Sequence, residues 1–143
     1  MEERPKLDGE WFNDYGSRME LSVAHGLVSG TYFSMEGDDI GRFRVTGLVD
    51  EHPGGDGLTV GLIVSWRDLD STSKAISSDS PNQEAASSHW MTSLIGQLHA
   101  IDGHEILSTT FLLTKNTSAE NRWEDTVVNT MVFRRDASGF PRS

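Results

Sequence analysis

The chain has 143 residues, which suits a single domain, and 36% of them are hydrophobic, enough for a small β-protein whose strands have one wet face. It contains no cysteine, so disulfide and thiolate chemistry are excluded. The formal net charge of −10 argues against nucleic acids and anionic membranes as partners, because phosphate groups are bound by clustered Lys and Arg.

No apolar run approaches the roughly 18 residues that a membrane-spanning helix needs. The first ten residues are charged and lack the apolar segment of a secretory signal. We therefore expect neither a transmembrane helix nor a secretory signal, and the compartment is left open.

Alternating polar and apolar residues predict a series of short β-strands. Met19, Leu21 and Val23 alternate with polar neighbours, which is the period of a half-buried strand. The apolar run 58–66 is rich in β-branched residues, which fit a pleated surface. The predicted strands are 9–13, 18–23, 27–35, 43–49, 58–66, 88–99, 105–114 and 125–134.

Turn-forming residues separate these runs. The predicted turns are Gly16-Ser17, His25-Gly26, the acidic residues 36–39, the cluster 50–57 and Asp102-Gly103, the last being a hairpin signal. Inside a strand, Gly96 is expected to mark a bend or a close approach of two backbones.

The segment 67–87 is rich in Ser and Asp and long for a hairpin loop, so we predict a mobile excursion with a short helical turn near 84–86. About eight closely spaced strands without a long helix favour a sandwich or a barrel, and eight strands make a barrel just wide enough for one small ligand. The predicted organisation is a flexible segment 1–8, a barrel domain 9–135 with the long loop 67–87, and a flexible tail 136–143.

Small polar residues gather on the first three strands. Tyr32 and Ser34 are two apart and share a face, while Asn13 and Ser17 flank the first turn. Inside an apolar barrel each unpaired polar group would cost about 1–3 kcal/mol, which favours a ligand site. The structural alternative is that Asn13 and Ser17 cap a turn and that the Tyr32 hydroxyl bonds to the backbone.

At these residues the sequence resembles the avidin and streptavidin family. The opening pattern is Trp11-Phe12-Asn13-x-x-Gly16-Ser17 followed by Gly30-Thr31-Tyr32-x-Ser34. Later anchors in the same order are Val64-Ser65-Trp66, Gly96-Gln97, Leu112-Leu113-Thr114 and Asn121-x-Trp123, so the resemblance covers about residues 11–133. It implies an all-β, eight-stranded antiparallel up-and-down barrel that binds biotin in its open end without catalysis, usually as a homotetramer.

The resemblance also assigns roles to particular residues. The ureido oxygen of biotin is held by residues corresponding to Asn13, Ser17 and Tyr32, and a ureido N–H by Ser34. The remaining implied ligand contacts are Thr92 near the thioether sulfur, Trp66 as a wall of the ring, Phe111 where the family usually has a second Trp, Leu113 on the same strand, and Trp123 inserted from a neighbouring subunit.

Three positions depart from the family pattern. Met131 stands where an Asp or Asn usually accepts a ureido N–H, and we hypothesise that Asn129, on the same face, takes over part of that role. Trp90 replaces the Ser that binds the carboxylate tail, and Leu94 replaces an aromatic wall residue. We therefore expect reduced biotin affinity, or a related cyclic urea or amide as ligand.

The long loop offers two candidate partners for a tail carboxylate, Arg67 and Lys74. Thr110, Leu112 and Thr114 are predicted to face outward and to pack barrel against barrel, in a tetramer or a dimer.

The alternative function is an avidin-fold barrel that has lost biotin binding and binds a different ligand or serves as an oligomeric interaction module. An enzyme of lipocalin-like shape lacks motif support, and the five histidines lack metal-ligand spacing, so no cofactor or metal is expected.

Overall fold

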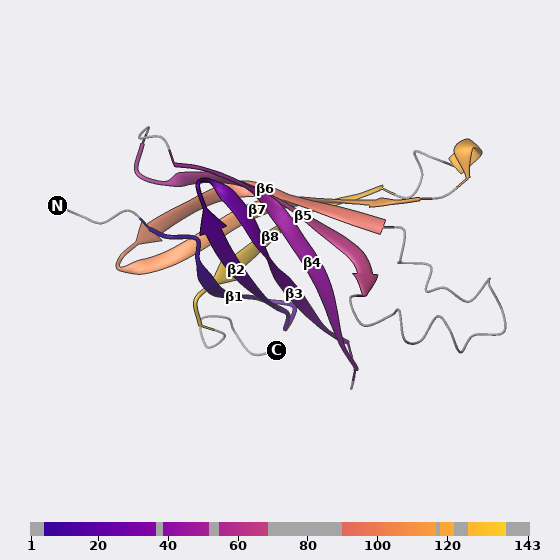
Figure 1. Ribbon diagram of the computed structural model, residues 1–143, viewed down its shortest axis with the longest axis horizontal. Helices are drawn as coiled ribbons and strands as arrows, with labels where there is room; N and C mark the ends of the chain where they lie inside the picture. The colour runs from indigo at the N-terminus through magenta and orange to yellow at the C-terminus, as the bar shows by residue number, and fades with distance from the viewer. Residues whose placement is uncertain are drawn as a thin grey trace.

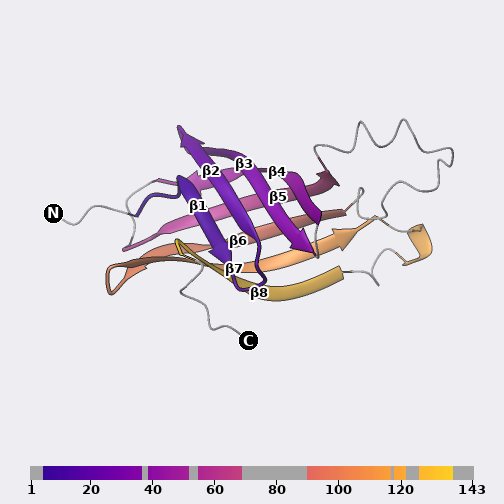
Figure 2. The ribbon, with the colours of Figure 1, turned by 90° about the horizontal axis from the view of Figure 1, so that it is seen from below.

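The computed structural model describes residues 5–36, 39–51, 55–68, 90–116, 118–121 and 126–136. Figures 1 and 2 show the strands wound into one barrel. The elements are β1 (Gly9–Asn13), β2 (Arg18–Ala24), β3 (Leu27–Glu36), β4 (Asp39–Asp50), β5 (Leu58–Asp68), β6 (Trp90–Ile101), β7 (His104–Lys115), the 3₁₀ turn η3 (Ala119–Asn121) and β8 (Thr126–Arg134). In the described residues, no helix has the length and apolar character to cross a membrane.

Each strand pairs antiparallel with the next in sequence, and β8 returns to pair with β1. The prediction of an eight-stranded antiparallel up-and-down barrel is therefore confirmed. Closure gives the outer strands partners on both sides, which removes the exposed edges of an open sheet.

Several strands extend beyond the predicted bounds. β4 begins at Asp39 instead of Phe43, and β5 continues to Asp68 instead of ending at Trp66. The extension of β5 pairs Asp68 with Phe43 across a bulge, because backbone pairing persists where the side-chain alternation is no longer legible. The helical turn predicted near 84–86, Lys74, and residues 69–87 of the predicted loop lie outside the described residues.

Two hairpin turns behave as their residues predict. His25 and Gly26 have φ values of 54° and 78°, and Asp102 and Gly103 have 52° and 81°. Two successive positive φ values match the twist of the flanking strands, so the β6–β7 register is fixed by this turn, with Ile101 opposite His104.

The inward side chains of one half of the barrel form a dense core. Trp11, Met19 and Phe133 have no exposed surface, and burying each large apolar side chain contributes about 1.5–3 kcal/mol. Other members of this core are Leu7, Leu62, Leu98 and Leu107. Toward the other end the inward residues become polar or half-buried, so solvent reaches the inner face there.

The seam between β1 and β8 is short, because only Phe12–Arg134 and Asn13–Phe133 pair across it. Arg135 reinforces it. Its guanidinium lies 3.7 Å from the ring centroid of Trp11, donates a hydrogen bond of 3.1 Å to the carbonyl of Glu10, and forms an ion pair of 3.5 Å with Glu105. The C-terminal end of β8 thus holds β1 in place beside Asn13.

Gly96 is a point of close backbone approach, as predicted. A Cβ at this position would lie 1.9 Å from the carbonyl oxygen of Ser108 on β7. At Gly61, on the neighbouring strand, the nearest atom to such a Cβ is the movable Cδ1 of Ile95 at 3.1 Å.

We predict that Gly96→Ala destabilises the barrel by about 1–3 kcal/mol, because two hydrogen-bonded strands must move apart. Thermal unfolding should show a melting temperature lower by about 3–10 °C. The matched variant Gly61→Ala should stay close to the wild type. Equal melting temperatures for Gly96→Ala and the wild type would show that the strands separate without cost.

Candidate ligand-binding site

Asn13, the last residue of β1, is 4% exposed and its side chain has two separate sets of contacts. Its Oδ1 accepts hydrogen bonds from the backbone N–H groups of Tyr15 at 3.0 Å and Ser17 at 2.9 Å. This arrangement caps the β1–β2 turn, as the structural alternative predicts. Because the oxygen is fixed by the turn, the amide nitrogen is directed into the barrel.

The amide nitrogen of Asn13 contacts two inward residues from distant strands. Nδ2 donates to the hydroxyl of Tyr32 on β3 at 2.9 Å and to Sδ of Met131 on β8 at 3.4 Å. The side chain of Ser17, just before β2, also hydrogen-bonds to the Tyr32 hydroxyl. Asn13, Ser17 and Tyr32 therefore converge in the barrel interior.

Burial raises the pKa of the Tyr32 hydroxyl above its ordinary value of 10.0, and the hydrogen bonds to Ser17 and Asn13 offset this only in part. The hydroxyl therefore keeps its proton at neutral pH. Three groups with N–H or O–H protons meet here, and such a cluster can donate to one carbonyl oxygen of a ligand.

An aromatic wall stands beside this polar cluster. The Trp66 ring on β5 meets Tyr32 edge-on at a centroid distance of 5.3 Å and Phe43 on β4 at 4.9 Å. Trp66 Nε1 donates a hydrogen bond of 2.6 Å to Oγ1 of Thr92, which is buried on β6. These contacts fix the orientation of the indole.

Sequence reasoning did not identify Phe43 as part of this wall. Its pairing with Tyr32 across the β3–β4 hairpin and its alternation with Val45 place it on the inner face. The turn residues between Glu36 and Asp39 contained that signal, because the register follows from the hairpin length.

The strands β7 and β8 supply the opposite side of the interior. Phe111 and Leu113 are half-buried on the inner face of β7, and Phe111 pairs with Asn129. Asn129 is exposed, and its Oδ1 accepts the N–H of Thr130 at 2.8 Å. The backbone carbonyl of Met131 accepts a hydrogen bond of 2.7 Å from Thr109.

The other predicted contact residues have different surroundings. Ser34 is half-buried on β3, two residues from Tyr32. Leu94 is 1% exposed and belongs to the core beneath Phe111, its cross-strand partner. Trp123 lies outside the described residues.

Two residues at the outer limit of the inner face form a pair that sequence reasoning missed. Trp90 on β6 lies opposite Lys115 on β7, and the Lys115 ammonium is 4.5 Å from the centroid of the Trp90 ring. Arg67, the described candidate partner for a tail carboxylate, is exposed next to inward-facing Trp66. Counting outward from the Asp102-Gly103 turn would have paired Trp90 with Lys115.

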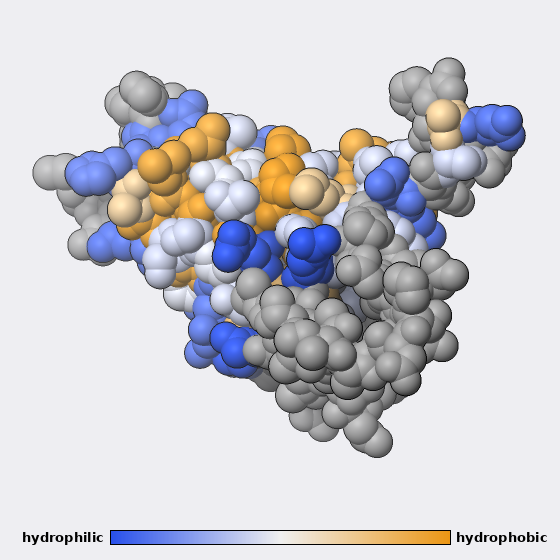
Figure 3. Space-filling view, turned by 45° about the vertical axis from the view of Figure 1, so that its right-hand side comes forward, coloured by the Kyte–Doolittle hydropathy of each residue, from blue (hydrophilic) through white to orange (hydrophobic). Residues whose placement is uncertain are grey.

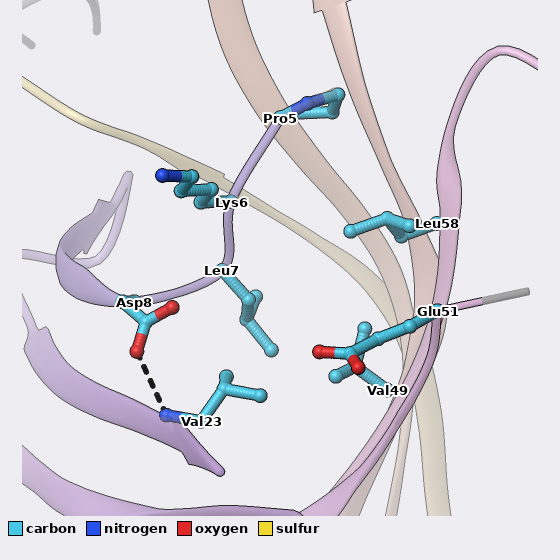
Figure 4. A pocket seen from close by; sticks show the side chains of 8 residues that line it. All are labelled: Pro5, Lys6, Leu7, Asp8, Val23, Val49, Glu51 and Leu58. Carbon is cyan, nitrogen blue, oxygen red and sulfur yellow. Dashed lines mark hydrogen bonds between the residues drawn. The ribbon is translucent and has the colours of Figure 1, made fainter. Parts of the chain in front are cut away.

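A separate cavity of about 330 Å³ lies at the opposite end of the barrel (Figure 4). It is lined by Pro5, Lys6, Leu7, Asp8, Val23, Val49, Glu51 and Leu58, and it shares no residue with the polar cluster. The Asp8 carboxylate accepts the backbone N–H of Val23 at 2.8 Å, which fastens the N-terminal segment over this end. The search for a metal site, confined to the described ranges, finds no cluster of three ligating side chains.

A closed up-and-down barrel with polar donors and an aromatic wall at one end has the architecture of a small-molecule binding protein. The sequence matches the model of the Avidin family over residues 1–136, and the chain belongs to this family. Membership supports a function of the biotin-binding type in general.

We predict a loss of stability at high pH that depends on Tyr32. As the pH rises above 10.0, the unfolded chain releases this proton before the folded protein does. The stability linked to the neutral hydroxyl is therefore complete below pH 10.0 and is lost as the pH rises through the folded-state pKa. Denaturant unfolding from pH 7 to 11 should show a smaller alkaline loss for Tyr32→Phe than for the wild type.

The control for this measurement is Tyr15→Phe, since the Tyr15 side chain is 58% exposed. It should keep the wild-type alkaline loss. An alkaline loss of the same size in Tyr32→Phe would contradict the role given to burial at this hydroxyl.

Proposed function

We propose that this protein binds biotin without catalysis, and that Asn13, Ser17 and Tyr32 donate hydrogen bonds to the ureido oxygen. The observation that carries the proposal is the convergence of these side chains from β1, the β1–β2 turn and β3. Fixed donors aimed at one carbonyl oxygen polarise it, and their orientation is set when the protein folds.

The aromatic and small polar residues around the cluster would hold the rest of the bicyclic ring. Trp66 and Phe43 offer apolar surface on one side, and Phe111 and Leu113 on the other. Ser34 would accept a ureido N–H, and Thr92 would approach the thioether. We assign Trp123 the part that the resemblance implies, the closure of a neighbouring subunit's site.

Two features would lower the affinity for biotin. The position facing a ureido N–H carries the Met131 thioether, which is a weak acceptor. A ligand must also replace the bond from Asn13 to Tyr32. The role of Asn129 as a substitute acceptor stays a prediction, with its Oδ1 already holding the N–H of Thr130. A related cyclic urea or amide is therefore a plausible ligand as well.

The second candidate function is a barrel that no longer binds biotin and acts through another ligand or as an interaction module. The observation in its favour is that Asn13, Ser17 and Tyr32 satisfy one another without a ligand. The two candidates differ in one measurable property, the saturable binding of biotin.

We predict that biotin quenches or shifts the intrinsic tryptophan fluorescence in a saturable way, because Trp66 lies against Tyr32. Tyr32→Phe and Asn13→Ala should each weaken binding by about tenfold or more, since each removes a donor to the same oxygen. Tyr15→Phe is the control that should bind like the wild type. A flat wild-type titration to high micromolar biotin would contradict the proposal and favour the second candidate.

We also propose that the protein is a homo-oligomer, a dimer or a tetramer. Thr110, Leu112 and Thr114 are exposed on the outer face of β7, as predicted. The exposed hydrophobic residues of this outer face are Ile63, Met91, Ile95, Leu112 and Val128, and we call them the β5–β8 patch. Such a contiguous apolar surface is typical of a subunit interface.

The shape of the molecule agrees with this proposal. A groove of about 590 Å³ crosses the outer face and includes Ile95, Thr110 and Thr130 in its lining. In Figure 3, hydrophobic residues form a band along the upper part of the molecule, above hydrophilic ones. A two-fold contact would place the same patch of two copies face to face.

Light scattering with size-exclusion chromatography should show a dimer or tetramer for the wild type. We predict that Leu112→Glu shifts it to smaller species, because a carboxylate would be buried in the contact. Ser22→Glu, on the exposed outer face of β2, is the control that should keep the assembly. A monomeric wild type would contradict the proposed interface.

A further inference from the structure

We propose that Lys115, held against Trp90, receives the carboxylate of the ligand's tail and makes the site selective for an anionic tail. This inference rests on the proposed binding of biotin and concerns the other end of that ligand. It replaces the earlier expectation that a cation of the long loop supplies this contact.

The first support is position. Trp90 and Thr92 share the inner face of β6, and Lys115, Leu113 and Phe111 share the inner face of β7. Trp90 lies two residues beyond Thr92, or roughly 7 Å of strand, and Lys115 lies four residues beyond Phe111, or roughly 13 Å. A tail that leaves a ring bound beside Thr92 and Phe111 therefore runs toward the Trp90–Lys115 pair.

The second support is the state of the Lys115 ammonium. It lies over the face of the Trp90 ring, 4.5 Å from the centroid, and the Lys115 side chain is half-buried. The ring attracts the cation without using its N–H donors, which leaves them available to an anion. Within the described ranges, Lys115 forms no ion pair with a carboxylate.

The third support is charge. The chain carries a formal net charge of −10, so the protein as a whole repels an anionic ligand. Among the described residues, Lys115 is the basic residue on the inner face at the end that carries Asn13 and Tyr32. Arg44 and Arg67 alternate with the inward residues Val45 and Trp66, so they lie on the outer face. A lone cation where the inner face meets solvent suits a singly charged carboxylate.

The test compares biotin with biotinamide, its neutral primary amide, by calorimetry on the full chain. We expect the wild type to prefer biotin by about three- to tenfold, the size of one partly exposed ion pair. Lys115→Gln should abolish this preference by weakening biotin alone, and Lys115→Arg should retain most of it. The preference should shrink as salt is raised.

Arg44→Gln is the matched control, because it removes one positive charge from the exposed outer face of β4. It should leave both affinities unchanged. Lys115→Met provides a second uncharged variant that keeps the apolar stem, with folding verified for each variant by its melting temperature.

The outcomes separate the two proposals. If the wild type binds both ligands equally, or if Lys115→Gln weakens both by the same factor, the role of Lys115 is overturned while biotin binding stands. If Arg44→Gln has the same effect as Lys115→Gln, the selectivity comes from net charge and the inference is wrong. If the wild type binds neither ligand, the proposed function fails and this inference fails with it.

Discussion

The side-chain amide of Asn13 joins the turn that ends β1 to the polar cluster inside the barrel. Its oxygen is held by the backbone N–H groups of Tyr15 and Ser17, and its nitrogen reaches Tyr32 and Met131. A single planar group therefore converts the geometry of a surface turn into the direction of an interior donor. If the turn changed, the donor would point elsewhere.

This arrangement depends on the closure of the barrel. β1 is only five residues long and meets β8 through a short seam, which Arg135 strengthens by stacking on Trp11. The core around Trp11, Met19 and Phe133 then fills one half of the cylinder completely. Because that half is solid, the half-buried residues at the other end form the interior surface that a ligand could meet.

Much of the fold could be predicted from the sequence, because alternation and turn residues report directly on strands. Met19, Leu21 and Val23 show the period of a half-buried strand, and Asp102-Gly103 fixes a hairpin. Strand ends were harder, as β5 shows, since backbone pairing continues through residues whose side chains give no pattern.

The candidate site was partly predictable for a related reason. Asn13, Ser17 and Tyr32 are close enough in sequence to be read as one motif, and their convergence follows from neighbouring strands. The Trp66–Phe43 and Trp90–Lys115 contacts depend on cross-strand register, which the sequence analysis did not count out. The contact from Asn13 to Met131 spans nearly the whole chain and required the closed barrel.

The central claim is that three side chains polarise one carbonyl oxygen of the ligand. The most direct measurement is isotope-edited infrared spectroscopy of biotin labelled with ¹³C at the ureido carbonyl. Bound to the wild-type protein, the carbonyl stretch should fall below its frequency in water and move back toward that value in Tyr32→Phe. A bound band at or above the frequency in water, unaffected by Tyr32→Phe, would contradict the account.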